Sequence, residues 1–487
     1  MPFHLFHLEA GSSRTLQQQI RSQLTAAILN GNIPVDMALP SSRKLSELLG
    51  VSRNTVIRVY ELMLSENVII SRERSGYYIN PEYRAQAALP RSEASGDDQV
   101  NWQRFLHQKP SEQRNIVKQS HWQRYSYPFV YGQFDPQSFP VQQWRECCRD
   151  SVTEAAVGNW ASDQLMDDPM LIEHIQSHIL PRRGIWAKPE QILITVGAQH
   201  AIYLVSELVL RPGDTFGIED PCYVDVRNIA AARPANVVPI PLDDEGLVVD
   251  ERLSECDCIY VTPSHQFPTT VTMTLERRKQ LLLKAAEDDF LIIEDDYEAE
   301  ANFTGTPCPA LKSIDHAGRV IYVGSFSKTL APGLRLGYMV ADEALIKEAH
   351  ALRRLMLRQA PMNNQRTVAL FIARGYYDAL INRQSLMYKE RWHLMREALA
   401  RHLPNSTNPP TFGGSSYWIE GPTELDSRKL SELARADSIL IEPGEIYYAK
   451  APLLNCFKLG YSSIASDKIE PGIDRLAQLI NSHWGSS

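Results

Sequence analysis

The sequence predicts an α/β protein in which a small N-terminal winged helical domain precedes a larger body, a mostly parallel β-sheet between helices. Three observations lead to this prediction. Apolar residues recur at helical spacing in the first eighty residues, short apolar runs alternate with helix-like stretches after residue 190, and a polar segment separates the two regions. With 487 residues, 44% apolar and 22% charged, the chain has the composition of a globular protein of two or more domains.

Two helices are predicted before residue 50. Apolar residues recur every four positions from Leu16 to Ile28, a helical stripe that Asn30-Gly31 and Pro34 end. The run Pro40-Ser41-Ser42 offers a cap for a short helix that carries three leucines, and Gly50 ends this helix as a left-handed residue would. A tight turn is expected to follow directly.

A third helix and a hairpin complete the N-terminal domain. Ser52 caps a helix whose apolar residues between Val56 and Met63 have core-facing spacing. The first turns of its opposite face are polar, where a recognition helix meets the major groove and the flanking phosphates. Two short strands, 68–70 and 77–79, follow and are joined by an arginine-bearing tip. This order of elements favours DNA binding over the alternative of a small domain for protein contact.

The motifs of this domain resemble the GntR family of winged-helix regulators. The resemblance rests on Leu39-Pro40-Ser41-Ser42-Arg43-x-Leu45 and on Leu49-Gly50-Val51-Ser52-Arg53-Asn54-Thr55-Val56. It implies a DNA-binding domain of residues 1–82 and a double-stranded DNA operator as partner. The family usually has glycine where Arg74 stands, so the hairpin tip is expected to contact the DNA backbone differently. The residues expected at the DNA are Arg43, Ser52, Arg53, Asn54, Thr55, Arg58, Arg72, Ser75 and Gly76.

Charge and composition limit the possible partners. The overall net charge is −8, but the first 84 residues carry +2, so the acidity of the chain does not exclude DNA. The seven cysteines lack paired Cys-x-x-Cys spacing, so neither a disulfide framework nor a metal site is expected. The N-terminus has no basic stretch before an apolar run, and no segment approaches the length of a membrane span. We expect a cytoplasmic protein.

A linker and an α/β body follow the winged domain. Residues 83–118 are expected to form a flexible linker, because apolar periodicity fades and small, proline and charged residues dominate. Residues 119–487 form the predicted body. In such folds ligands bind beyond strand ends and at helix N-termini. The predicted strands are Ile192–Val196, Thr215–Ile218, Cys258–Val261, Leu291–Ile293, Val320–Val323 and Leu336–Val340.

Residues suited to binding pyridoxal phosphate (PLP) follow several of these strands. Lys328 comes shortly after the run that ends at Val323, as expected for a lysine that forms an imine with this cofactor. Ser325, Ser327 and Arg335 would complete a phosphate site, to which Arg335 supplies a permanent, fork-shaped cation. The sequence therefore predicts Lys328 as the catalytic lysine.

Three further segments support the same prediction. The segment Gly197-Ala198-Gln199 begins a helix whose free N–H groups and dipole can hold a phosphate, and Tyr223 can stack on a planar ring. The segment Asp295-Asp296-Tyr297 offers a carboxylate for a pyridine nitrogen and a phenol for the ring oxygen. The residues alone leave open which aspartate faces the nitrogen. Each segment also has a purely structural interpretation, but their ordered coincidence favours a PLP site.

The body resembles fold-type I aminotransferases, and specifically the MocR subfamily, in which a GntR-type module is fused to such a body. The resemblance rests on the segment from Gly324 to Tyr338 and on Thr262-Pro263-Ser264-His265-Gln266-Phe267-Pro268. It implies a smaller C-terminal α+β subdomain and a domain-swapped homodimer. It also implies Lys328 for the Schiff base, Asp295 for the pyridine nitrogen, Tyr297 for the ring oxygen, Tyr223 for stacking, and His265 and Gln266 near the cofactor.

The substrate side of the body combines one further resemblance with three departures. The segment from Gly132 to Asp135 resembles the family segment that approaches the substrate, so Tyr131 is expected to line an effector pocket, with a role in packing as the alternative. Met166 replaces a tyrosine that normally reaches the phosphate of the dimer mate. Thr270 replaces a glycine, which is expected to alter the local backbone. Lys458 replaces the arginine that binds carboxylates, and it offers a point charge without the fork.

Together these features predict a transcription regulator that holds PLP on Lys328 and senses a small amino compound by external aldimine formation. Two alternatives remain open at this stage. The chain could be a working aminotransferase with an appended DNA-binding module, or a regulator that senses PLP itself. The sequence does not define the effector, the operator, or whether transcription is activated or repressed.

Overall fold

The computed structural model describes residues 8–9, 12, 14–73, 75–83, 100–132, 135, 138–153, 158, 165–233, 235–303, 308–407, 413–450 and 452–484. The chain divides into two compact units, residues 1–107 and 108–487. Within the described ranges, no helix is both long and apolar enough to cross a bilayer.

The N-terminal unit contains the predicted winged helix-turn-helix. Thr15, Ser41 and Ser52 cap its three helices with their side chains, and Gly50 ends the second helix at a φ of 64°. The apolar stripes of the first and third helices meet in one buried core. The elements are α1 (Leu16–Leu29), α2 (Ser42–Leu49), α3 (Arg53–Ser65), β1 (Ile69–Arg72) and β2 (Gly76–Ile79).

The body contains an eight-stranded sheet in the order β4-β11-β10-β9-β8-β5-β6-β7. The central strands from β10 to β6 run parallel, whereas β11 and β7 are antiparallel to their neighbours. This confirms the predicted, mostly parallel sheet. The strands are β4 (Ile192–Thr195), β5 (Thr215–Asp220), β6 (Asn236–Asp243), β7 (Gly246–Leu247), β8 (Cys258–Val261), β9 (Leu291–Asp296), β10 (Val320–Ser325) and β11 (Gly337–Val340).

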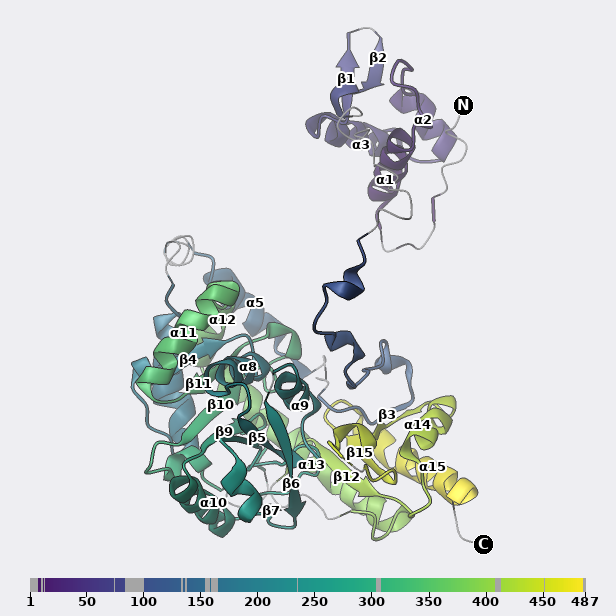
Figure 1. The fold of residues 1–487 in the computed structure, drawn as a ribbon. Coiled ribbons are helices and arrows are strands. Elements are labelled where there is room, and N and C mark those ends of the chain that lie inside the picture. The colour runs from purple at the N-terminus through teal and green to yellow at the C-terminus, as the bar shows by residue number, and fades with distance from the viewer. Residues whose placement is uncertain are drawn as a thin grey trace. The chain divides into compact units, whose positions relative to one another are not determined.

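Helices cover both faces of this sheet (Figure 1). Successive strand residues alternate between the two faces: Leu193 packs into one core, and its neighbours Ile192 and Ile194 pack into the other. One face carries α8 (Ala198–Val209), α9 (Val224–Ala231) and α11 (Glu343–Leu357). The other carries α5 (Val141–Asp150), α7 (Pro169–His174), α10 (Leu275–Asp288) and α12 (Met362–Ala373).

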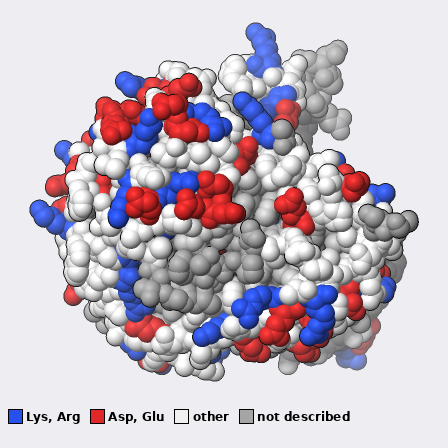
Figure 2. Space-filling view, turned by 90° about the horizontal axis from the view of Figure 1, so that it is seen from below, with Lys and Arg blue, Asp and Glu red and all other residues white. Residues whose placement is uncertain are grey.

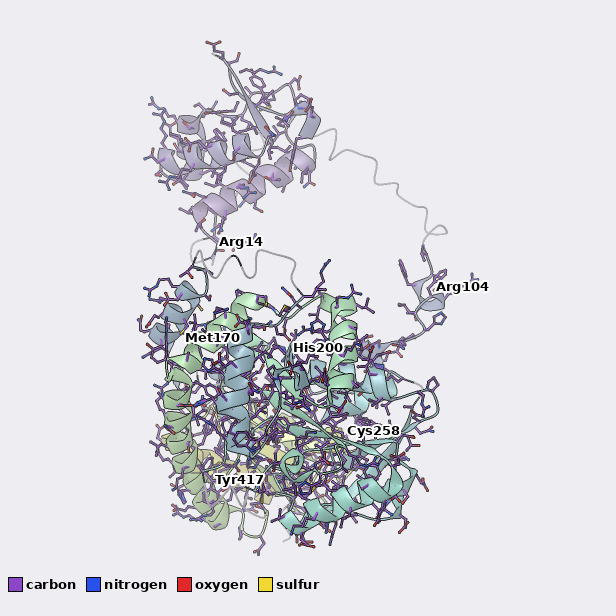
Figure 3. The ribbon with its side chains drawn as sticks, turned by 90° about the vertical axis from the view of Figure 1, so that its left-hand side faces the viewer. Arg14, Arg104, Met170, His200, Cys258 and Tyr417 are labelled. Atoms are coloured by element: carbon purple, nitrogen blue, oxygen red, sulfur yellow. The ribbon has the colours of Figure 1, made fainter. Side chains whose placement is uncertain are left out.

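A smaller α+β subdomain completes the body. The long helix α13 (Tyr376–His402) packs against both α12 and α15. In the three-stranded sheet β12-β15-β14, Lys458 is the cross-strand neighbour of both Trp418 and Glu442. Tyr417 lies in the core of this subdomain, and Cys258 lies in the central sheet (Figure 3). The other elements are β3 (Tyr127–Pro128), β12 (Ser416–Glu420), α14 (Ser427–Ala436), β13 (Ile439–Leu440), β14 (Glu442–Pro443), β15 (Cys456–Gly460) and α15 (Ser466–Trp484).

Two features differ from the sequence-based expectation. Strand β6 was not predicted, because Pro239 and Pro241 interrupt its apolar pattern. The expected linker extends too far, since residues 108–118 form hydrogen bonds to α9 and to the C-terminal subdomain. Residues 84–99 of the expected linker, and Arg74 at the hairpin tip, lie outside the described residues.

On the face of the body seen in Figure 2, acidic and basic side chains are interspersed.

Candidate functional site

A cavity with an empty volume of about 770 Å³ lies beyond the ends of β9 and β10, beside the start of α8. We call it the cofactor cavity. The sequence-predicted residues that line it are Tyr131, Ala198, Gln199, Tyr223, Asp295, Tyr297, Ser325, Ser327, Lys328 and Arg335. Five lining residues, Lys118, Gly132, Tyr260, Phe267 and Pro332, were not among the predicted site residues.

One end of the cofactor cavity is suited to a phosphate. Helix α8 begins after Gly197, whose φ of 81° turns the chain from β4 into the helix. The Arg335 guanidinium packs against this glycine, because a Cβ added there would lie 3.1 Å from the Arg335 Nη2. The free N–H groups of the helix start, the arginine and the hydroxyls of Ser325 and Ser327 therefore converge on one place.

Asp295 and Asp296 point to opposite sides of β9. Asp296 is fixed by charge: Arg183 Nε donates to its Oδ2 at 2.7 Å, and Tyr322 Oη donates to the same oxygen at 2.9 Å. Burial acts to raise the pKa of Asp296, but Arg183 and Tyr322 outweigh it and lower that pKa. Asp295 lines the cofactor cavity instead. The structure thus distinguishes two aspartates that the residues alone left open.

The carboxylate of Asp295 is only half satisfied. Tyr260 Oη donates to its Oδ2 at 2.7 Å, whereas its buried Oδ1 has no hydrogen-bond partner among the described residues. Burial raises the pKa of this carboxyl to about 7. A protonated pyridine nitrogen would satisfy the second oxygen and favour the charged form. The residues present therefore fit PLP at this point.

The Lys328 amine lines the cofactor cavity. Its Nζ lies 4.1 Å from the centre of the Tyr131 ring and 5.9 Å from that of Tyr297. Burial lowers its pKa to about 8, Glu298 opposes this shift, and the charge of Lys118 adds to it. The fraction of the amine that is neutral, and so nucleophilic, is therefore much larger near neutral pH than for a lysine with the ordinary pKa of 10.5.

Lys458 lies over the same aromatic side chains. Its Nζ is 3.4 Å from the centre of the Tyr131 ring and 3.7 Å from that of Phe267, and the residue is 1% exposed. Burial lowers its pKa to about 7, partly opposed by Glu442 and Glu298. Tyr131 is thus in contact with both lysines, as an effector-facing residue would be.

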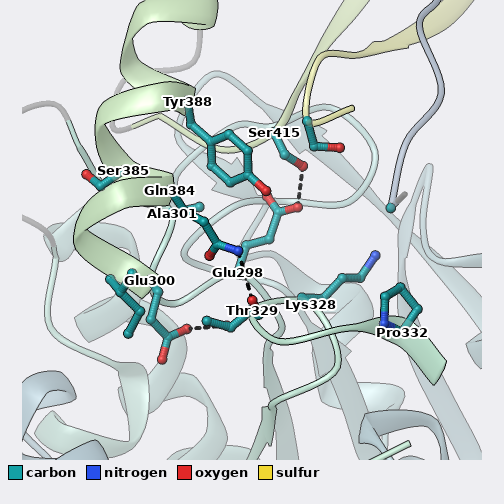
Figure 4. Close-up of a pocket in the computed structure, with 13 residues that line it drawn as sticks. Glu298, Glu300, Ala301, Lys328, Thr329, Pro332, Gln384, Ser385, Tyr388 and Ser415 are labelled. Carbon is teal, nitrogen blue, oxygen red and sulfur yellow. Dashed lines mark hydrogen bonds between the residues drawn. The ribbon is translucent and has the colours of Figure 1, made fainter. Parts of the chain in front are cut away.

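A second cavity, of about 570 Å³, meets the cofactor cavity at Lys328. The two share Gly132, Lys328 and Pro332 in their lining. We call the second cavity the antechamber. Its carboxylates are held by hydroxyl groups: Ser415 donates to Glu298, and Thr329 donates to Glu300 (Figure 4). Lys328 therefore borders both cavities.

Two predicted cofactor residues act elsewhere in the structure. Gln266 donates through its side-chain amide to the carbonyl of Pro221 at 2.8 Å and to Glu219 at 3.1 Å, so it joins the loops after β5 and β8. The His265 side chain is buried outside the cavity lining, and its backbone carbonyl accepts from Tyr297 Oη at 2.8 Å. The ring-oxygen loop instead presents Phe267 to the cavity.

The three departures from the family pattern have different structural consequences. Thr270 adopts a φ of 67°, so the threonine takes the left-handed conformation that a glycine adopts more easily. This conformation costs a non-glycine residue about 1–2 kcal/mol. Met166 is 66% exposed. Lys458 is the departure that faces the cavity aromatics.

The candidate DNA face is formed by α2, α3 and the hairpin. Arg53 Nε donates to Ser42 Oγ at 3.4 Å, and Asn54 and Arg58 are exposed on the same helix, α3. Arg43 is exposed and pairs with Glu47. The predicted residues with local structural contacts are Ser52, which caps α3, Thr55, which bonds to Ser52, and Arg72, whose guanidinium lies 4.3 Å from the centre of the Tyr78 ring. Ser75 and Gly76 are exposed at the hairpin tip.

Comparison with known proteins matches both parts of the chain. Residues 133–476 match the family "Aminotransferase class I and II", and residues 16–79 match "Bacterial regulatory proteins, gntR family". The HTH-type transcriptional regulator TauR of Rhodobacter capsulatus is 39% identical over 99% of both chains. The probable rhizopine catabolism regulatory protein MocR of Rhizobium meliloti is 28% identical over 96% of this chain and 94% of its own. The chain belongs to the MocR subfamily of GntR-type regulators.

A solved structure supports the cofactor assignment for this MocR-type protein. The kynurenine aminotransferase of Pyrococcus horikoshii, in complex with PMP, superimposes with a TM-score of 0.71 and 30% identity. The match covers 79% of this chain and 99% of the enzyme. Together with the half-satisfied Asp295, it identifies PLP as the cofactor of the MocR body. When bound, PLP supplies a carbonyl for an imine and a ring that withdraws electrons.

The lowered pKa of Lys328 predicts the pH dependence of PLP capture. In protein stripped of PLP, the rate constant for capture should rise with pH through a midpoint near 8 and then level off, because only the neutral amine attacks. A lysine with the ordinary pKa of 10.5 would give a rise that continues far beyond this midpoint. Stopped-flow absorbance measures the rate. Glu298→Gln removes an anion that raises the pKa, so its midpoint should move to lower pH; an unchanged midpoint would contradict the assignment.

The exposed arginines of α3 predict a loss of DNA affinity on substitution. Arg58→Ala should weaken binding to operator and unrelated duplexes severalfold, and it should lower the salt dependence by about one counterion, as expected for a lost phosphate contact. The matched control is Arg21→Ala, since Arg21 lies on α1 and pairs with Glu66 at 2.8 Å. Fluorescence anisotropy at several salt concentrations measures both quantities. Equal losses in the two variants would argue against α3 as the DNA face.

Proposed function

We propose that this protein is a cytoplasmic transcription regulator in which PLP on Lys328 is the receptor for a small amino compound. The observation that carries the proposal is the position of Lys328 between two cavities. The cofactor cavity fits PLP, and the antechamber would be the route by which a second ligand reaches the same nitrogen. The amino compound would replace Lys328 by external aldimine formation and free the lysine to move.

The residues around Lys328 support recognition of the amino compound. Tyr131 and Lys458 lie beside the lysine and are proposed as effector-binding residues. Lys458 is a point charge, so it can attract a carboxylate or another anion without the paired geometry that arginine requires. Of the residues that the sequence predicted at the cofactor, we propose as contacts those that line the cofactor cavity. Gly197, which precedes α8 at the same end, is proposed with them.

A homodimer is also part of the proposal. Helix α11 ends in Leu355, Met356 and Leu357, whose exposed fractions are 74%, 46% and 37%. A run of exposed apolar residues at a helix end is typical of an interface. A domain-swapped dimer would place two winged helices on one operator, and its half-sites would be separated by whole helical turns.

Turnover as an aminotransferase is the second candidate. It is favoured by the retained set of Lys328, Asp295 and Tyr297 around one cavity. Thr270 and Lys458 lie in the same region and depart from the enzyme pattern, so we rank this function second. A sensor of PLP itself is the third candidate; it requires that apoprotein and holoprotein differ in affinity for the operator.

An absorbance titration of the holoprotein with amino acids, amines and amino sulfonates distinguishes these functions. We expect one class of compound to convert the internal imine into a stable external aldimine, without formation of pyridoxamine phosphate. The variant Lys328→Ala should lack the starting internal imine. Conversion by many compounds to pyridoxamine phosphate, reversed by keto acids, would establish an enzyme instead. No spectral change with any compound would overturn effector sensing.

A further inference from the structure

The segment of residues 108–118, which we call the strap, is fastened to the body next to the cofactor cavity. Gln113 Nε2 donates to the backbone carbonyl of Asn228 at 3.0 Å, and Asn228 Nδ2 donates to the carbonyl of Arg114 at 3.0 Å. Gln108 Nε2 donates to the carbonyl of Ala232 at 3.1 Å, and Asn115 Nδ2 donates to Asp225 Oδ1 at 3.2 Å. These contacts hold the strap along α9.

The strap ends in a lysine that lines the cofactor cavity. A Cβ added at Gly132 would lie 3.7 Å from the Nζ of Lys118 and 2.9 Å from the Nζ of Lys328. Both amines therefore face the same glycine. Lys118 makes no hydrogen bond or ion pair with any residue that the structure describes. Its charge nevertheless contributes to the lowered pKa values of both Lys328 and Lys458.

Three lysines thus converge where PLP requires only one. Lys328 forms the imine, and the phosphate end of the cavity is served by Arg335 and the start of α8. Lys118 and Lys458 are not needed by the cofactor. Lys328 and Lys458 both lie near the Tyr131 ring and repel each other as like charges, a repulsion that Glu298 and Glu442 partly offset. The charge of Lys118 adds to the repulsion, and an anionic group on the ligand would offset it.

We propose that Lys118 binds the anionic group of the amino compound that exchanges with Lys328. This inference rests on the proposed function and names its ligand class: a small primary amine that carries a carboxylate or sulfonate. Lys118 is the last residue of the strap, so the strap supplies one side chain of the ligand site. Ligand binding would therefore hold this end of the strap at the cofactor cavity through an ion pair.

The test compares anionic and uncharged amines of similar length on the full-length holoprotein. The probes are β-alanine, 2-aminoethanesulfonate and n-propylamine, and dissociation constants come from absorbance titrations. We expect Lys118→Gln to raise the dissociation constants of the anionic probes roughly tenfold relative to wild-type protein, as for a lost charged hydrogen bond. The dissociation constant of n-propylamine should change by less than about twofold. Lys118→Arg should retain most of the affinity. Lys109→Gln is the matched control, since Lys109 lies on the strap and pairs with Glu112.

A second variant tests the strap without touching the cavity. Asn228→Ala removes the hydrogen bond to Arg114, so it should reproduce the selective loss in weaker form. Equal weakening of all three probes by Lys118→Gln, or no weakening, would overturn the role of Lys118 while effector sensing stands. If wild-type protein bound n-propylamine as tightly as the anionic probes, the ligand class would be wrong. If it responded to none of the three, the proposed function and this inference would fail together.

Discussion

The burial of one carboxylate and one amine in the same cavity is the constraint on which the body depends. Asp295 keeps an oxygen without a partner among the described residues, and Lys328 is held in an environment that disfavours its charge. Neither arrangement is favourable for a protein alone, because buried polar groups are costly when unsatisfied. A cationic pyridine ring and an imine would satisfy both groups. The cavity is thus organised for a bound cofactor.

The strands and loops around the cavity determine which side chains face it. Alternation along β9 places Asp295 in the cavity and Asp296 on the opposite side, where Arg183 binds it. The parallel strands bring their carboxyl ends to one edge, and α8 begins at the same edge. Gln266, in the loop after β8, donates to Glu219 of β5 and to the carbonyl of Pro221 in the loop after β5. The cofactor groups therefore come from distant segments but depend on one sheet.

The sequence predicted most of this site because strand ends can be read from apolar runs. Lys328, Asp295, Tyr297 and Tyr223 all follow such runs. His265 and Gln266 were expected at the cofactor through a motif, but packing decides which loop side chain faces the cavity, and Phe267 does. Lys118 gave no local signal, since it lies in a polar segment that contacts the body only through long-range hydrogen bonds. Strand β6 was not predicted from the sequence, because its two prolines interrupt the apolar run.

The most direct test of the central claim is to make exchange at Lys328 chemically impossible. Borohydride reduction converts the internal imine into a stable secondary amine, which keeps PLP in place but prevents any amino compound from replacing the lysine. Operator affinity would then be measured by fluorescence anisotropy with and without the effector, for reduced and untreated protein. If exchange is the switch, the reduced protein binds the operator but its affinity no longer changes with effector. An undiminished response in the reduced protein would contradict the claim.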